Sequence, residues 1–137
     1  MAALERPEFL VPAGYGQLMH ERRHYSQGVR VGAFVIVAGQ GGWTDELKVP
    51  DDPLEELRLA FRNVGTVLAE GGAGWNDVIE VTSYHVDLDA SALDATAQLL
   101  REHCPGHEPL WTVLGVARLA RPEMRIEITA RAVTEPS

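Results

Sequence analysis

One amphipathic helix constrains the fold of this chain more than any other feature of its sequence. Asp52 can cap the helix, Pro53 suits its first position, and Glu55 completes a capping box. A Gly-Gly pair at 71–72 supplies the left-handed backbone that ends it. Between these signals apolar residues recur at spacings of three and four, as on the buried face of a helix: Leu54, Leu57, Phe61, Val64 and Leu68.

β-prone segments lie on both sides of this helix. Segments 25–31 and 34–39 are separated by Gly32-Ala33, which predicts a hairpin. The last segment, Arg125 to Val133, alternates apolar and polar residues as a half-buried strand does. Two further strands are predicted at 78–86 and 111–116, and a second helix from Ser91 to about His103, where Cys104-Pro105-Gly106 stops it.

The element order β-β-α-β-α-β-β predicts an α+β fold, a mixed sheet with both helices on one face. The length of 137 residues fits one domain, 1–137. Residues 1–21 contain several Pro and Gly residues without a sustained period, so we expect an irregular N-terminal arm. The other sheet face mixes apolar and polar residues, Glu127 among them. We expect that face to be buried against another subunit.

Charge and cysteine content narrow the function. Twelve Lys and Arg against twenty Asp and Glu give a net charge of −8, which disfavours nucleic acid as a partner. The single cysteine, Cys104, excludes an internal disulfide and fits a reducing compartment. Neither a secretory signal nor a membrane span is evident. We therefore expect a cytoplasmic protein with no membrane partner.

Metal and cofactor motifs are weak in this sequence. His20 and His24, and likewise His103 and His107, have a spacing that occurs in metal sites, but no acidic motif accompanies either pair. Cys104 lacks the motif of a catalytic nucleophile. The glycine-rich turns lack the Walker lysine and the dinucleotide fingerprint. We expect no metal site and no cofactor.

Five segments in order, spread over about residues 25–133, resemble the Rid family, also called the YjgF/YER057c/UK114 family. The resemblance implies a homotrimer of chorismate-mutase-like domains with three pockets at the subunit interfaces. It also implies hydrolysis of reactive enamines and imines, such as 2-aminoacrylate, to keto acids and ammonia. The segments are Tyr25-Ser26-Gln27-Gly28-Val29-Arg30-Val31-Gly32, Val37-Ala38-Gly39-Gln40, the stretch from Asn63-Val64 to Asp77-Val78, Val116-Ala117-Arg118-Leu119 and Arg125-Ile126-Glu127-Ile128.

The resemblance also assigns site residues. Glu127 matches a glutamate that positions the attacking water, and Tyr25 matches a tyrosine that lines the pocket, so both are the expected catalytic residues. Gly39, with Gln40 beside it, matches a segment whose backbone contacts the ligand. Trp111 stands where the family has an arginine that clamps the substrate carboxylate. Gly39, Gln40 and Trp111 are therefore the expected substrate-binding residues.

Replacing that arginine changes what the pocket can bind. An arginine offers a bidentate fork to a carboxylate, whereas an indole offers one N–H and a flat apolar face. Trp111 therefore either selects an aromatic or apolar ligand or fills the pocket. The leading hypothesis is a Rid-like deaminase of a small imine or enamine, without the standard 2-aminoacrylate specificity. The alternatives are a non-catalytic trimer that binds a small ligand in the same intersubunit pocket and, least favoured by the charge, an RNA-acting protein.

Overall fold

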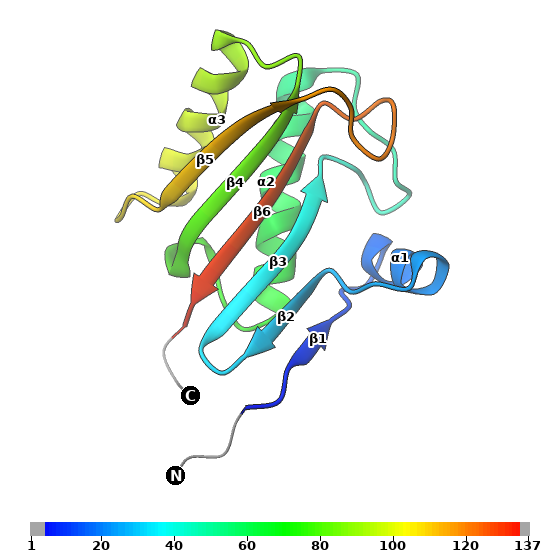
Figure 1. The fold of residues 1–137 in the computed structure, drawn as a ribbon, viewed down its shortest axis with the longest axis vertical. Coiled ribbons are helices and arrows are strands. Elements are labelled where there is room, and N and C mark those ends of the chain that lie inside the picture. The colour runs from blue at the N-terminus through cyan, green and yellow to red at the C-terminus, as the bar shows by residue number, and fades with distance from the viewer. Residues whose placement is uncertain (1–4, 135–137) are drawn as a thin grey trace.

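A mixed six-stranded sheet in the order β1-β2-β3-β6-β4-β5 forms the centre of the structure. The computed structural model describes residues 5–134, and Figure 1 shows the sheet with two helices behind it. Neighbouring strands are antiparallel except β4 and β5, which are parallel. The strands are β1 (Glu8–Leu10), β2 (Gly28–Val31), β3 (Phe34–Gly41), β4 (Val78–Val86), β5 (Leu110–Val116) and β6 (Ile126–Val133). The predicted α+β fold is confirmed.

The two helices behind the sheet are α2 (Pro53–Glu70) and α3 (Ala90–His103). Asp52 caps α2 by accepting a hydrogen bond from the Leu54 amide at 3.2 Å. Asp89, and not the predicted Ser91, caps α3: its side chain accepts from the Ala92 amide at 2.8 Å. None of the helices within residues 5–134 is long and apolar enough to cross a membrane.

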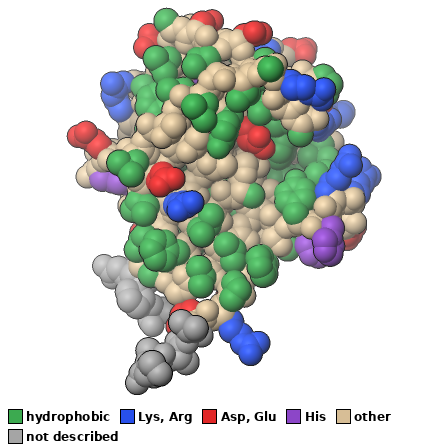
Figure 2. Space-filling view, in the orientation of Figure 1, with side chains coloured by type: hydrophobic (Ala, Val, Ile, Leu, Met, Phe, Trp, Pro, Cys, Tyr) green, Lys and Arg blue, Asp and Glu red, His purple; other side chains and the backbone are tan. Residues whose placement is uncertain are grey.

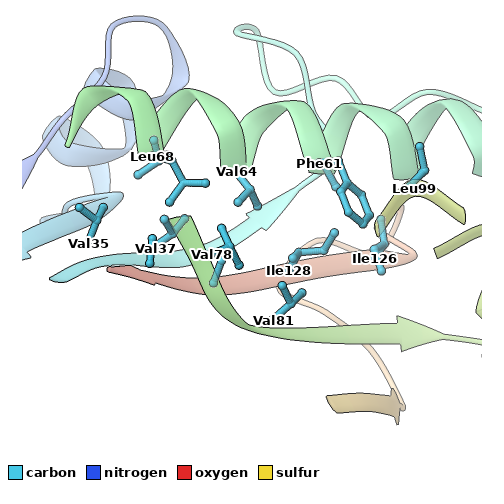
Figure 3. Packing of buried hydrophobic residues seen from close by; sticks show 14 of the residues in the cluster. Val35, Val37, Phe61, Val64, Leu68, Val78, Val81, Leu99, Ile126 and Ile128 are labelled. Carbon is cyan, nitrogen blue, oxygen red and sulfur yellow. The ribbon is translucent and has the colours of Figure 1, made fainter. Parts of the chain in front are cut away.

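The core lies between α2 and the sheet. Figure 3 shows Phe61, Val64 and Leu68 pointing from α2 toward the side chains of β3, β4 and β6. Phe61 is fully buried and stacks on Trp75 of a short 3-10 turn, η1 (Trp75–Asp77), and on His103, with ring centroids 5.1 and 5.2 Å apart. Burying a side chain of this size stabilises the fold by about 1.5–3 kcal/mol.

The N-terminal arm differs from the sequence-based expectation. Residues 1–4 lie outside the described residues, but 8–10 form β1 and Tyr15–Arg23 form a helix, α1. Phe9 pairs with Val29 across the edge of the sheet, and the buried Tyr15 anchors α1 through a hydrogen bond from its hydroxyl to Gln40. These contacts are tertiary, so they leave no periodic signal in the local sequence.

Candidate functional site

A β-bulge shapes the centre of the open sheet face, the face that α2 and α3 leave uncovered. Val37 pairs with Ala130 and Gln40 pairs with Ile128, so Ala38 and Gly39 together lie opposite one residue of β6. Bulges of this kind re-aim side chains and are common beside active sites. Here the bulge brings the Gly39 backbone against the side chain of Glu127, which projects from β6.

Glu127 and Gly39 are in close contact. A methyl group added at Gly39 would lie 2.4 Å from the Glu127 Oε1 atom, so the carboxylate could not keep its present position beside any other residue. Glu127 is half-buried, and this burial raises the pKa of its carboxyl group. None of the three ion pairs found within residues 5–134 includes Glu127. A raised pKa makes the carboxylate a stronger base, which suits this group to accept a proton and return it.

Tyr25 lines a groove of about 540 Å³ on the same face, between α1 and strands β1 to β3. Ala38 is one of the residues that line this groove, so the groove borders the bulge that contains Gly39. His20 and His24 line it from the side of α1. In Figure 2 hydrophobic side chains are spread over this face among a few charged groups, and histidine lies at the side where Figure 1 places α1. The structure thus places Tyr25 and Glu127 on one surface.

Gln40 has a different place from the predicted one. Its side chain is fully buried beneath the bulge, where it accepts a hydrogen bond from the Tyr15 hydroxyl. Its amide nitrogen donates to Gln27 Oε1 at 2.8 Å and to the Ala38 carbonyl at 3.0 Å. Burial raises the pKa of Tyr15, which keeps its phenol protonated as a donor. Gln40 therefore supports the bulge from below and does not present its side chain to a ligand.

Trp111 lies on the opposite face of the sheet from Glu127. It is in register with Val81 on the helix-covered side and packs against the core. Its indole N–H donates to Ser83 Oγ at 2.9 Å, and Ser83 Oγ lies 2.9 Å from His85 Nε2. Trp111 lines a separate cavity of about 700 Å³ between α3 and β5. Within one chain the structure does not bring Trp111 together with Tyr25, Gly39 and Glu127.

The histidine pairs are placed differently from each other. His20 and His24 line one groove, whereas His103 stacks on Phe61 and His107 Nε2 donates to the Val78 carbonyl at 2.7 Å. Within residues 5–134 no group of three or more His, Cys, Asp or Glu side chains is arranged to hold a metal ion. The free thiol of Cys104 is buried, and burial raises its pKa, which disfavours the reactive thiolate.

Sequence reasoning missed the groove residues Phe9, His20 and His24 as members of one site. The signal available for Phe9 was the short β-prone run Glu8-Phe9-Leu10-Val11, which can add an edge strand beside Val29. For the histidines, the spacing of four was visible, but the helix that places them on one wall was not predicted.

Comparison with known proteins identifies the family. The model of the family described as Endoribonuclease L-PSP matches residues 17–134. This chain belongs to that family, the YjgF/UK114 or Rid family. The resemblance seen in the sequence is thereby confirmed.

Individual relatives agree with this assignment. The chain is 34% identical over 120 residues to RutC family protein YjgH of Escherichia coli K12, covering 88% of this chain and 91% of that protein. It is 30% identical to 2-iminobutanoate/2-iminopropanoate deaminase of Mus musculus, covering 82% of each. The crystal structure of E. coli TdcF with bound serine superposes with a TM-score of 0.73 at 30% identity, covering 81% of this chain and 88% of that one.

Proposed function

We propose that this protein is a Rid-type deaminase that hydrolyses a small imine or enamine. The observation that carries the proposal is the Glu127 carboxyl group, half-buried against Gly39 in a strand bulge, with a raised pKa. Family membership supports it, because the mouse relative is named as a 2-iminobutanoate/2-iminopropanoate deaminase and TdcF as a putative reactive intermediate deaminase.

The proposed reaction converts an imine and one water molecule into a carbonyl compound and ammonia. The water oxygen forms a bond to the C=N carbon while Glu127 accepts a proton from that water. Glu127 returns that proton to the nitrogen, which gives the carbinolamine. The remaining O–H proton then passes through Glu127 to the nitrogen as the C–N bond breaks with its electron pair on ammonia and the C=O bond of the product forms. An enamine first takes a proton on carbon to become the imine. The raised pKa of Glu127 suits both proton transfers.

We further propose that the protein acts as a homotrimer in which neighbouring copies cover the open face and enclose the site between subunits. Large apolar side chains exposed on this face support the proposal: Phe34 is 48% exposed, Leu110 69% and Leu114 43%. Exposed apolar groups that lie together on one sheet face are typical of a surface that another chain buries.

The substrate of the proposed enzyme differs from 2-aminoacrylate. Trp111 stands at the position of the carboxylate-clamping arginine, and the lining of the groove beside Glu127 contains neither Lys nor Arg among the described residues. Without a cation in place, burial of a small anionic imine leaves its carboxylate poorly compensated. The proposed site therefore favours an imine whose binding depends on its apolar part.

Small-molecule chemistry fits the charge of this chain better than RNA cleavage does. The family description names an endoribonuclease. RNA binding requires phosphate neutralisation by basic side chains, and the net charge here is −8. Imine hydrolysis requires one positioned carboxylate and a water-accessible pocket, both of which the open face offers.

The test generates imines in situ with an amino-acid oxidase. Semicarbazide traps the imine that has not been hydrolysed, so less adduct means faster hydrolysis. We expect the wild-type chain to consume imine and Glu127→Gln to lose about 100-fold of that rate. Glu80→Gln is the matched control, because Glu80 lies on the same face and its one ion pair within residues 5–134 is with Arg131, at 4.0 Å. Equal rates in wild type and Glu127→Gln would overturn the proposal. Saturable ligand binding with no rate for any imine would favour a binding protein instead.

A further inference from the structure

Three apolar side chains from three strands form the floor of the groove beside Glu127. Phe9 pairs with Val29, and Val29 pairs with Ile36, so the three lie in one row across β1, β2 and β3. All three line the groove, and Phe9 is 65% exposed. Ala38 also lines the groove, and it directly precedes Gly39, against which the Glu127 carboxyl group packs. The apolar floor therefore leads to the proposed reaction centre.

Helix α1 supplies the wall of the groove. His24 ends the helix in the left-handed conformation, with φ of 61°, and its amide donates to the His20 carbonyl at 3.2 Å. The chain then enters β2 through Tyr25 and Ser26, so that both imidazole rings and the phenol border the same space. No carboxylate, ammonium or guanidinium group lines it among the described residues.

The size and lining of the groove match a site for a small apolar group. Its volume of about 540 Å³ lies within the range of about 300–1,000 Å³ typical of ligand pockets. Aromatic rings at Phe9 and Tyr25 offer faces and edges for contact with another ring. A charged side chain would lose hydration here without gaining an ionic partner.

We infer that this groove is the side-chain subsite of the enzyme and that it accepts imines bearing an aryl or branched alkyl group. The inference rests on the proposed function, because it takes Glu127 as the reaction centre. The substituent lies on Phe9, Val29 and Ile36, and its C=N group reaches the bulge at Gly39. The substrate class is thus the imines of hydrophobic amino acids, with aromatic ones preferred.

The first experiment compares two imino acids that share a carboxylate and differ only in their side chain, those derived from phenylalanine and from alanine. We expect Phe9→Ala to lower kcat/KM for the phenylalanine-derived imine about tenfold relative to the alanine-derived one. Val29→Trp, which fills the middle of the floor, should lower the same ratio. Leu93→Ala is the matched control: Leu93 is 37% exposed on α3 and does not line the groove. It should leave the ratio at the wild-type value.

A second measurement separates this inference from the proposed function. Indole is titrated into the wild-type protein, and the methyl resonances of Val29 and Ile36 are followed by NMR. Shifts at these methyls that weaken in Phe9→Ala support the groove whether or not any imine is hydrolysed. If the wild type hydrolyses both imines but neither groove variant changes the ratio, the subsite is overturned and the proposed function stands. If no imine is hydrolysed, the proposed function is overturned, and absent indole shifts would then overturn the groove as well.

Discussion

The two faces of the sheet differ in how far their side chains are buried and paired with hydrogen-bond or ionic partners. On the helix-covered face, Ile128 of β6 is fully buried beneath the equally buried Phe61 of α2, and the polar Ser83 is hydrogen-bonded to Trp111. On the open face, Phe9 and Phe34 are exposed and Glu127 is half-buried outside the ion pairs of residues 5–134. Strands β3, β4 and β6 contribute to both faces.

Because successive side chains of a strand point to opposite faces, one strand can supply core residues to one face and reactive residues to the other. Alternate residues of β6 serve opposite needs, since Ile126 and Ile128 fill the core while Glu127, between them, projects into the open face. A substitution on one face can therefore change stability with little effect on the proposed site, and a substitution on the other can do the reverse. The following predictions test that separation.

The largest effect is expected from removing an aromatic ring on the covered face. Phe61→Ala should lower the free energy of unfolding by about 3–5 kcal/mol, because the side chain is fully buried and stacks on Trp75 and His103. Phe9→Ala on the open face should change it by less than about 0.5 kcal/mol, because the ring is 65% exposed. Urea denaturation of both variants measures the difference, and similar losses in the two would contradict the separation of the faces.

The second-largest effect is expected from removing the arginine that pairs with the buried Glu56 carboxylate. Glu56 is fully buried, but it accepts hydrogen bonds from the Arg125 amide at 2.7 Å and from Arg125 Nε at 2.5 Å. Arg125→Met should cost about 2–3 kcal/mol, because it leaves the Glu56 carboxylate buried with only the amide donor. Adding Glu56→Gln to that variant should recover part of the loss in urea denaturation. No recovery would mean that the cost arises from packing and not from the unpaired charge.

The smallest effect on the free energy of unfolding is expected at Glu127, where the substitution should stabilise the protein and not destabilise it. Burial raises the pKa of Glu127 above its ordinary value of 4.5, so the folded protein holds the proton more tightly than the unfolded chain. The resulting stabilisation is present below pH 4.5 and is lost as the pH rises through the folded-state pKa. Glu127→Gln should therefore stabilise the protein at pH 8 by on the order of 0.5 kcal/mol, a value reduced for solvent screening.

Thermal unfolding at two pH values measures this effect. The gain in stability should appear at pH 8 and vanish near pH 4, while Glu80→Gln should show no such gain. A Glu127→Gln variant that is less stable than wild type at pH 8 would show that the carboxylate is stabilising, which contradicts the burial argument. Together with the loss of activity expected of the same variant, a gain would mark Glu127 as a residue that serves chemistry at the expense of stability.

The sequence was sufficient for the parts of the fold that rest on local signals. Helix α2 begins after Asp52 and ends at Gly71 as its caps indicate, because capping and periodicity depend on neighbouring residues. Glu127 and Gly39 were expected at the site from the family resemblance, which stays a prediction; the structure places the Glu127 side chain against the Gly39 backbone.

The features that the sequence does not predict depend on contacts between distant residues. Helix α1 lacks a side-chain N-cap and is anchored by the contact from Tyr15 to Gln40, 25 residues away. The side of the sheet that Trp111 faces follows from its register with Val81, and no local pattern fixes that register in an edge strand. Gln40 was expected at the ligand because its backbone position adjoins Gly39, yet its side chain points into the core.

The bulge in β3 also has a consequence for how this strand can change. Val37 and Gln40 are three positions apart, which in a regular strand would place them on opposite sides, yet both are buried on the helix-covered side. Because of the added residue, the odd-numbered Val35 and Val37 face the helices before the bulge, whereas the even-numbered Gln40 faces them after it. Deleting either Ala38 or Gly39 would make the number of residues on β3 equal to that on β6, so Gln40 would stay on the helix-covered side and the bulge would be lost. The extra residue is therefore not what keeps Gln40 in the core; it is what brings the Gly39 backbone against the Glu127 carboxyl group.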